Sequence, residues 1–204
     1  MISQLLRTAL LFSGVFWSGC IVEAQVIEFE NNGLHYQSLT RGAVTVMCAR
    51  LPTELKDWGL IQIAISNGSE AYVTFSPEDF EFDRGDGRVT PAGSADAVVG
   101  DVLERGNHSD LVKLIKTYED AIYNIPNMKL DNSYEKRREA ALGFGTSARF
   151  EAAAAASAIA LVQTRIPPGQ STDGAVFFRF GSKSFPPGHL VVHNGGETFV
   201  FNQE

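Results

Sequence analysis

Hydrophobic and polar residues alternate along much of the chain that follows residue 25. Ile61, Ile63 and Ile65 are separated by polar or small residues, and the segment 71–75 repeats this period of two. A period of two places alternate side chains on one face, which is typical of a half-buried strand. The same alternation predicts a shorter strand at 80–83. The pattern therefore predicts a first block of strands.

Two segments rich in Asn and Gly predict tight hairpin turns. Ser66-Asn67-Gly68-Ser69 separates the strands at 61–65 and 71–75, and Asn194-Gly195-Gly196 separates 190–193 from 197–201. Asn and Gly tolerate the positive φ angles of two-residue hairpin loops. We therefore expect each pair of flanking strands to pair directly.

Between the strand blocks the apolar residues recur at the helical period. Predicted helices lie at 111–122, 132–142 and 152–162. Asn107 or Ser109 can cap the first helix, and Glu135 completes a capping box at the start of the second. The third helix is rich in alanine and is flanked by charged residues. That composition favours a helix packed on its neighbours over a membrane span.

Strand signals return after the helical segment, at 175–180 and in the second hairpin. The Pro-Pro-Gly tripeptides at 167–169 and 186–188 suit type II turns, since proline presets φ and glycine accepts a positive φ. Strands and helices do not alternate along the chain, as they would if the sheet were parallel. We expect a mainly β chain, an antiparallel sandwich with a helical insertion at about 95–165 between its two strand blocks.

The N-terminal segment 1–24 has the features of a signal peptide. Arg7 supplies a positive charge, an apolar stretch follows, and the segment is too short to span a bilayer. Signal peptidase I would cleave after Ala24, which leaves Gln25 as the first residue. Alternatively, Trp17-Ser18-Gly19-Cys20 resembles a bacterial lipoprotein signal, with Trp where Leu is usual. We expect residues 25–204 to form one domain, which is periplasmic, extracellular or membrane-anchored.

Three elements carry a resemblance to a protein class. They are the strand ending in Ser66-Asn67-Gly68-Ser69, the corner Ser76-Pro77-Glu78-Asp79-Phe80, and the turn Pro167-Pro168-Gly169-Gln170-Ser171 before a Val- and Phe-rich strand. This layout resembles uncharacterised bacterial secreted and lipoprotein domains with immunoglobulin-like folds. The resemblance covers the two strand blocks and implies an immunoglobulin-like β-sandwich in the cell envelope. It implies no catalytic residue.

Charge and cysteine content narrow the classes of partner. The 204 residues carry a formal charge of −7, and removal of residues 1–24 takes one base and one acid, so the acidity belongs to the mature domain. An acidic domain argues against binding to nucleic acid or to an anionic membrane surface. A lipid on Cys20 would be the contact with a membrane. Cleavage or lipidation of Cys20 leaves Cys48 unpaired, and we expect it to be a small buried hydrophobe.

Motifs for catalysis and for metal binding are absent from the sequence. His189 and His193 lie four residues apart in a predicted strand, which is too far for one ion. The acidic residues Asp79, Glu81, Asp83 and Asp86 lack the order of a calcium loop, so we expect a solvated turn there, including its Arg84-Gly85-Asp86 tripeptide. Turn and cap roles likewise explain the Asn-x-Ser sites at Asn67 and Asn107. We expect no cofactor.

Three functional hypotheses follow. The first is a non-catalytic secreted or envelope-anchored interaction module that offers edge strands and loops to another envelope protein. The second is a carrier or sensor of an apolar ligand held between the helix face of Tyr118 and the sheet. The third is a hydrolase whose site is assembled from distant segments, with an acid such as Asp79 or Glu81 beside a histidine.

Overall fold

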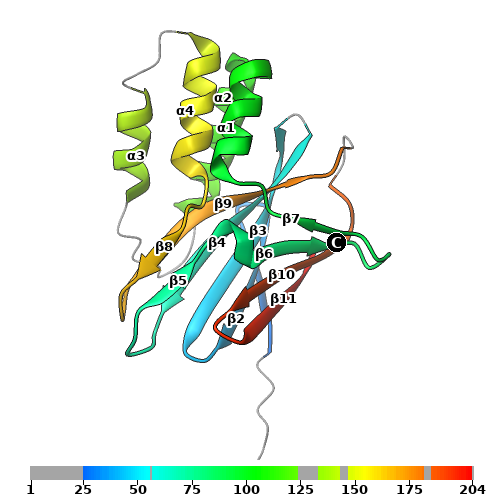
Figure 1. Ribbon diagram of the computed structural model, residues 1–204, viewed down its shortest axis with the longest axis vertical. Coiled ribbons are helices and arrows are strands. Elements are labelled where there is room, and N and C mark those ends of the chain that lie inside the picture. Colours follow the sequence, from blue (N-terminus) through cyan, green and yellow to red (C-terminus); the bar gives the residue numbers. More distant parts are fainter. Residues whose placement is uncertain (1–24, 56, 124–132, 143–146, 182–184, 204) are drawn as a thin grey trace, which may run out of the picture.

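The computed structural model describes residues 25–55, 57–123, 133–142, 147–181 and 185–203 (Figure 1). In chain order the strands are β1 (Ile27–Asn31), β2 (Leu34–Arg41), β3 (Val44–Leu55), β4 (Trp58–Asn67), β5 (Val73–Phe75), β6 (Phe80–Asp83), β7 (Val89–Pro91), β8 (Thr164–Ile166), β9 (Ser171–Arg179), β10 (Gly188–Asn194) and β11 (Glu197–Gln203). The helices are α1 (Ala95–Arg105), α2 (His108–Ile122), α3 (Ser133–Leu142) and α4 (Ala148–Ile159), with a short 3-10 turn at Pro77–Asp79. The prediction of a mainly β chain with antiparallel sheets and some helices is confirmed.

The strands form two larger sheets and one short ribbon. One sheet has the order β1-β2-β3-β4-β9, the second has the order β11-β10-β6-β7, and β5 pairs with β8. All these pairs are antiparallel. Strand β9 joins β4 although about 100 residues separate them, so the second strand block completes the sheet that the first one begins.

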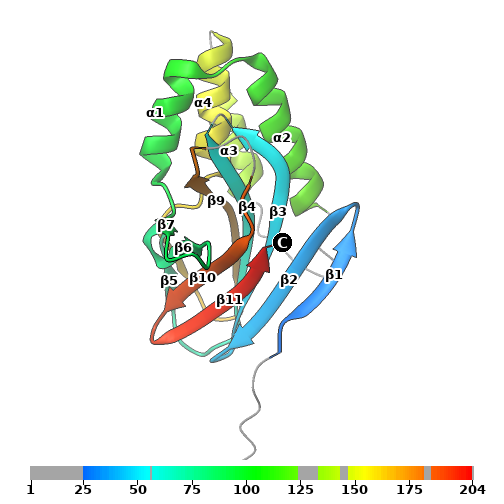
Figure 2. The ribbon, with the colours of Figure 1, turned by 90° about the vertical axis from the view of Figure 1, so that its right-hand side faces the viewer.

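The two faces of the five-stranded sheet bury different cores (Figure 2). Ile61, Ile63 and Ile65 of β4 pack toward an aromatic cluster with residues of β6, β10 and β11. Leu60 and Ala64 of the same strand pack with residues of the helices. The helices therefore form a third layer, on the face of the sheet opposite the four-stranded sheet. This explains why β4 is buried along nearly its whole length rather than half-buried as its alternation predicts.

The two predicted hairpins had different outcomes. The second is confirmed, because β10 pairs with β11 and both Gly195 and Gly196 have positive φ. The first is wrong, because β4 pairs with β3 and β9 while β5 pairs with β8. The Asn67 amide donates from Nδ2 to the carbonyl oxygens of Ala71 and Ile166 at 2.7 and 3.0 Å. These bonds direct the chain out of the sheet.

The two Pro-Pro-Gly tripeptides also adopt different backbone conformations. Gly169 has a φ of +70°, and the Gln170 N–H donates to Pro167 O at 3.2 Å, as a type II turn requires. Gly188 instead is the first residue of β10 and pairs with Gln203. The prediction of a turn is therefore confirmed at the first tripeptide and wrong at the second, where sheet pairing extends the backbone.

The three predicted helices are present with shifted ends. Asn107 caps α2 with the side chain accepting from Asp110 N, as predicted. Helix α4 begins at Ala148 and ends at Ile159, because the extended Ala160 makes a bridge with Ala175 of β9. Helix α1 was not predicted individually, and the Ser94 side chain caps it by accepting from Ala97 N.

No helix in the described part of the chain is long and apolar enough to cross a membrane. Residues 1–24, with Cys20 and Ala24, lie outside the described residues, so both cleavage alternatives stay predictions. Gln25 is exposed and precedes β1.

Candidate functional site

The pairing of strand β3 with both neighbouring strands, β2 and β4, is interrupted near the middle of β3. Its pairing with β2 ends at Ala49, and its register with β4 shifts between Arg50 and Glu54. Within the described sheet, Leu51, Pro52 and Thr53 have no partner in either ladder. Proline lacks an N–H and is found at edges and bulges rather than in paired strands, so Pro52 accounts for the interruption.

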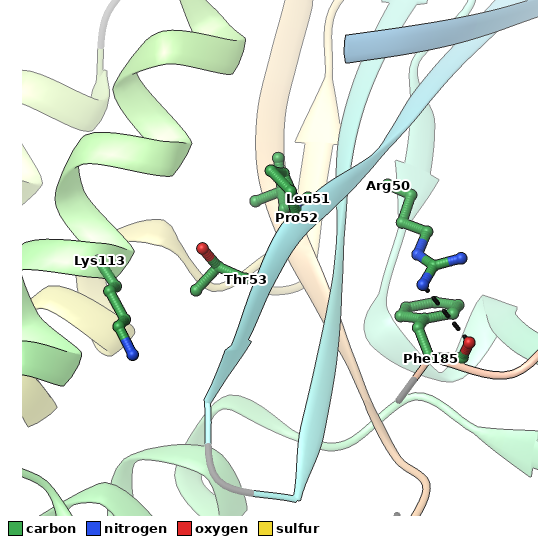
Figure 3. Close-up of a pocket in the computed structure, with 6 residues that line it drawn as sticks. All are labelled: Arg50, Leu51, Pro52, Thr53, Lys113 and Phe185. Carbon is green, nitrogen blue, oxygen red and sulfur yellow. Dashed lines mark hydrogen bonds between the residues drawn. The ribbon is translucent and has the colours of Figure 1, made fainter. Parts of the chain in front are cut away.

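Two adjoining cavities lie along this interruption, and Figure 3 shows the residues that line the first of them. The first, of about 450 Å³, is lined by Arg50, Leu51, Pro52, Thr53, Lys113 and Phe185. The second, of about 310 Å³, shares Arg50 and Pro52 with the first and is otherwise lined by Gly33, Leu34, His35, Asn202 and Gln203. We call the two together the Arg50 trough. Its size is in the range of ligand sites.

The walls of the Arg50 trough are held by specific contacts. The Arg50 guanidinium lies 4.4 Å from the centre of the Phe185 ring and donates from Nη2 to Phe185 O at 3.4 Å. The Thr53 and Thr117 hydroxyls share a hydrogen bond of 2.8 Å between β3 and α2. The Tyr36 hydroxyl donates to Ala121 O at 2.8 Å. These two bonds fix α2, and with it Lys113, beside the strand.

The described lining of the Arg50 trough is positively charged, although the chain carries −7. Arg50 and Lys113 carry this charge, and no acidic side chain is among its described lining residues. His35 Nε2 lies 3.7 Å from Glu28 Oε2, outside the lining. The arrangement suits an anionic group, because guanidinium and ammonium groups bind carboxylates through charge-assisted hydrogen bonds.

The acidic residues of the first strand block serve local structure. Asp79 accepts from Ser76 N at the start of the 3-10 turn, Asp83 accepts from Gly85 N, and Asp86 accepts from the backbone and side chain of Arg88. The hydrogen bonds from Arg88 hold the pKa of Asp86 below its usual range. In the described part of the chain no three His, Cys, Asp or Glu side chains gather for a metal ion. These contacts hold the local turns of this segment.

The two histidines of β10 lie in a strand, as predicted. His193 Nε2 lies 3.2 Å from Glu81 Oε1, and its Nδ1 lies 3.2 Å from Thr198 Oγ1. The structure thus brings Glu81 beside a histidine, the contact that the hydrolase hypothesis requires. His193 is exposed and Glu81 is partly exposed, and neither lines the Arg50 trough.

A polar cluster between the helices and the sheet was not predicted from the sequence. The Tyr118 hydroxyl donates to Asp173 Oδ2 at 2.5 Å, and Arg137 Nη2 lies 3.7 Å from the same oxygen. Burial raises the pKa of Asp173, and the Tyr118 hydrogen bond and Arg137 oppose that shift. Asp173 lies two residues before Ala175 on the helix-facing side of β9, so a longer predicted strand would have placed it in the core.

Gln62 of β4 is a second buried polar residue on the helix-facing side of the sheet. It is 1% exposed, and neither Nε2 nor Oε1 has a hydrogen-bond partner in the described structure. An unpartnered buried amide costs about 1–3 kcal/mol. We expect Gln62→Met, of similar shape, to raise the free energy of unfolding by about 1 kcal/mol in urea denaturation. A loss of stability would show that the amide has a partner after all.

Cys48 is buried on the sandwich side of β3, 1% exposed, as predicted. Burial raises the pKa of its thiol well above the ordinary value, against the opposing effect of the Gln203 amide 3.7 Å from the sulfur. We expect Cys48 of the folded processed protein to react with a disulfide reagent about 100-fold more slowly than in urea-unfolded protein, since only a thiolate that solvent reaches is attacked. Equal rates, followed by reagent absorbance, would contradict this.

Asn67 and Tyr118, two other residues with predicted roles, are both buried. Asn67 is fully enclosed with its amide donating to two carbonyls, which supports its turn role and leaves no place for a sugar. Tyr118 contacts the Tyr134 ring and donates to Asp173, and the apolar ligand expected beside it stays a prediction.

No family model, curated protein or solved structure matches the chain in comparisons with known proteins.

Proposed function

We propose that the protein is an exported, non-catalytic interaction module that binds a segment of another envelope protein in the Arg50 trough. The observation that carries the proposal is the unpaired stretch of β3 beside a cavity of ligand size. A partner's extended segment can pair with unpaired strand backbone, and side-chain pockets then provide selectivity. Thr53 supplies the hydroxyl group of the first cavity, and this hydroxyl shares a hydrogen bond with the Thr117 hydroxyl. It has no general base as its hydrogen-bond partner among the described residues, which favours binding over catalysis.

The proposed location rests on the N-terminal segment. Either cleavage route exports the chain, and lipidation of Cys20 would in addition anchor it. Intact mass and membrane partition of the native protein, compared with Cys20→Ser, test the two routes. A diacylglyceryl-modified product that Cys20→Ser abolishes establishes the lipoprotein. Identical soluble proteins beginning at Gln25 establish cleavage by signal peptidase I.

The immunoglobulin-like class is part of the proposal. Two antiparallel sheets that share an aromatic core support it at the level of architecture. The strands β1 to β4 pair in chain order, which is a meander rather than the Greek key of immunoglobulin domains. The proposed likeness therefore concerns the packing of the two sheets.

A site-directed crosslink tests partner binding in the trough. A photoreactive amino acid is placed at Lys113, which lines the first cavity, and in a control protein at Lys116, one turn or less away on the same helix. We expect irradiation of intact cells to link one envelope protein from position 113 and much less from position 116. Equal linking from both positions, or none from either with the protein monomeric, would argue against the proposed function.

The hydrolase is the second candidate, because Glu81 and His193 are in contact. Both side chains are more than one third exposed on an open sheet face, where water is not excluded and a carboxylate-histidine pair has little catalytic advantage. The trough is therefore the better supported site. Turnover of a chromogenic ester panel that His193→Gln abolishes would reverse this order.

A further inference from the structure

The charges of the Arg50 trough are divided between its two sides. Figure 3 shows Lys113 on α2 on one side of the segment Leu51–Thr53, and Arg50 over Phe185 on the other. His35 is among the residues that line the second cavity. A ligand that lies along Leu51–Thr53 thus meets a cation on each side, with no acidic side chain among the described lining residues between them.

The backbone between those cations is suited to an extended ligand. Successive residues of a strand rise about 3.3 Å, so Leu51 to Thr53 faces a segment of similar length that can exchange backbone hydrogen bonds with it. Neighbouring side chains in such a segment point to opposite sides. Acidic residues at neighbouring positions would therefore face one cation each.

We infer that the Arg50 trough selects an extended protein segment with Asp or Glu at neighbouring positions, whose carboxylates contact Arg50 on one side and Lys113 on the other. The inference rests on the proposed function and names its ligand chemistry. The planar guanidinium of Arg50, stacked on Phe185, matches a carboxylate and can form two parallel hydrogen bonds with it. Lys113 contributes a more mobile charge from α2.

The experiment uses the processed protein and three labelled peptides of one length. The first repeats pairs of Glu between pairs of Thr with both ends blocked, the second replaces each Glu by Gln, and the third is the Gln peptide with a free C-terminal carboxylate. Binding is followed by fluorescence anisotropy at 20 mM and 300 mM NaCl. We expect the Glu peptide to bind at least about 10-fold more tightly than the blocked Gln peptide, and to weaken at high salt.

Matched variants place the effect in the trough. Arg50→Gln and Lys113→Gln are each expected to weaken the Glu peptide about fivefold and to leave the blocked Gln peptide unchanged. Arg165→Gln is the control for the first, because Arg165 also stacks on an aromatic ring, Tyr72 at 4.1 Å, but lies outside the trough. Lys116→Gln is the control for the second. Circular dichroism confirms that each variant is folded.

The outcomes separate the inference from the proposed function. Equal binding of the Glu and blocked Gln peptides would overturn the acidic ligand and leave segment binding in place. Tighter binding of the third peptide than of the Glu peptide would overturn the inference of acidic side chains, in favour of a terminal carboxylate as the ligand. No binding of any peptide at millimolar concentration would overturn both. A loss caused equally by Arg165→Gln would show that general charge, and not the trough, attracts the peptide.

Discussion

Replacement of Phe82 by alanine is expected to lower the free energy of unfolding by about 3–5 kcal/mol, the range for a buried Phe. The Phe82 ring is fully buried, and its centre lies 5.7, 5.1 and 5.2 Å from the rings of Phe178, Phe180 and Phe185. Phe82 belongs to the four-stranded sheet and Phe178 to the five-stranded sheet. Its loss removes contacts between the two sheets and leaves a cavity that rigid strands cannot close.

Urea unfolding of the processed protein, followed by circular dichroism, measures the effect. Phe150→Ala is the control, because Phe150 is 57% exposed on α4 and its loss is expected to cost less than about 0.5 kcal/mol. A loss below about 1.5 kcal/mol for Phe82→Ala would show that the aromatic cluster does not join the sheets.

The same substitution has an expected consequence for the trough. Phe185 stands between Phe82 and Arg50, in contact with both. Without the Phe82 ring beside it, Phe185 holds the Arg50 guanidinium less firmly, so a folded Phe82→Ala protein should also bind the acidic peptide more weakly. Core packing and the proposed site are thus connected through one ring.

Short sequence patterns correctly predicted the turns and caps whose conformation depends on neighbouring residues. The hairpin at Gly195 and Gly196 and the cap at Asn107 depend on residues within a few positions, and both are present. Asn67 has the same turn chemistry, yet its amide bonds Ile166, 99 residues away. Since a tertiary contact decides that turn, the pattern around Asn67 alone predicted a hairpin that does not form.

The trough could be predicted only in part. Pro52 interrupts an otherwise continuous strand pattern, and a proline there indicates a break in pairing. Arg50, Lys113 and Phe185 come from three distant segments with no shared motif, and only the packing of α2 and of the aromatic cluster brings them together. The buried Gln62 was missed because the alternation of its strand predicted a solvated face that the helices in fact cover. Asp173 was missed because the predicted strand at 175–180 began after it.

Removal of the Asp173 carboxylate is the second large expected effect. Asp173→Ala leaves the enclosed Tyr118 hydroxyl without its acceptor and takes the carboxylate away from Arg137. A buried donor without an acceptor costs about 1–3 kcal/mol, so we expect the free energy of unfolding to fall by about 2–3 kcal/mol at pH 7. Asp173→Asn keeps an oxygen that can accept from Tyr118 and should cost less. Urea denaturation of both variants compares them.

The pH dependence of the Asp173→Asn comparison tests the cause. Burial raises the pKa of Asp173 in the folded protein above its ordinary value of 3.8, so the folded state holds this proton more tightly than the unfolded chain does. The resulting stabilisation is complete below the unfolded pKa and is lost as pH rises through the folded pKa. Asn does not titrate. The wild-type protein should therefore lose stability relative to Asp173→Asn as pH rises through this window, and the difference should then stay constant. A difference that instead moves in favour of the wild-type protein would mean that Arg137 and Tyr118 outweigh burial and lower the pKa.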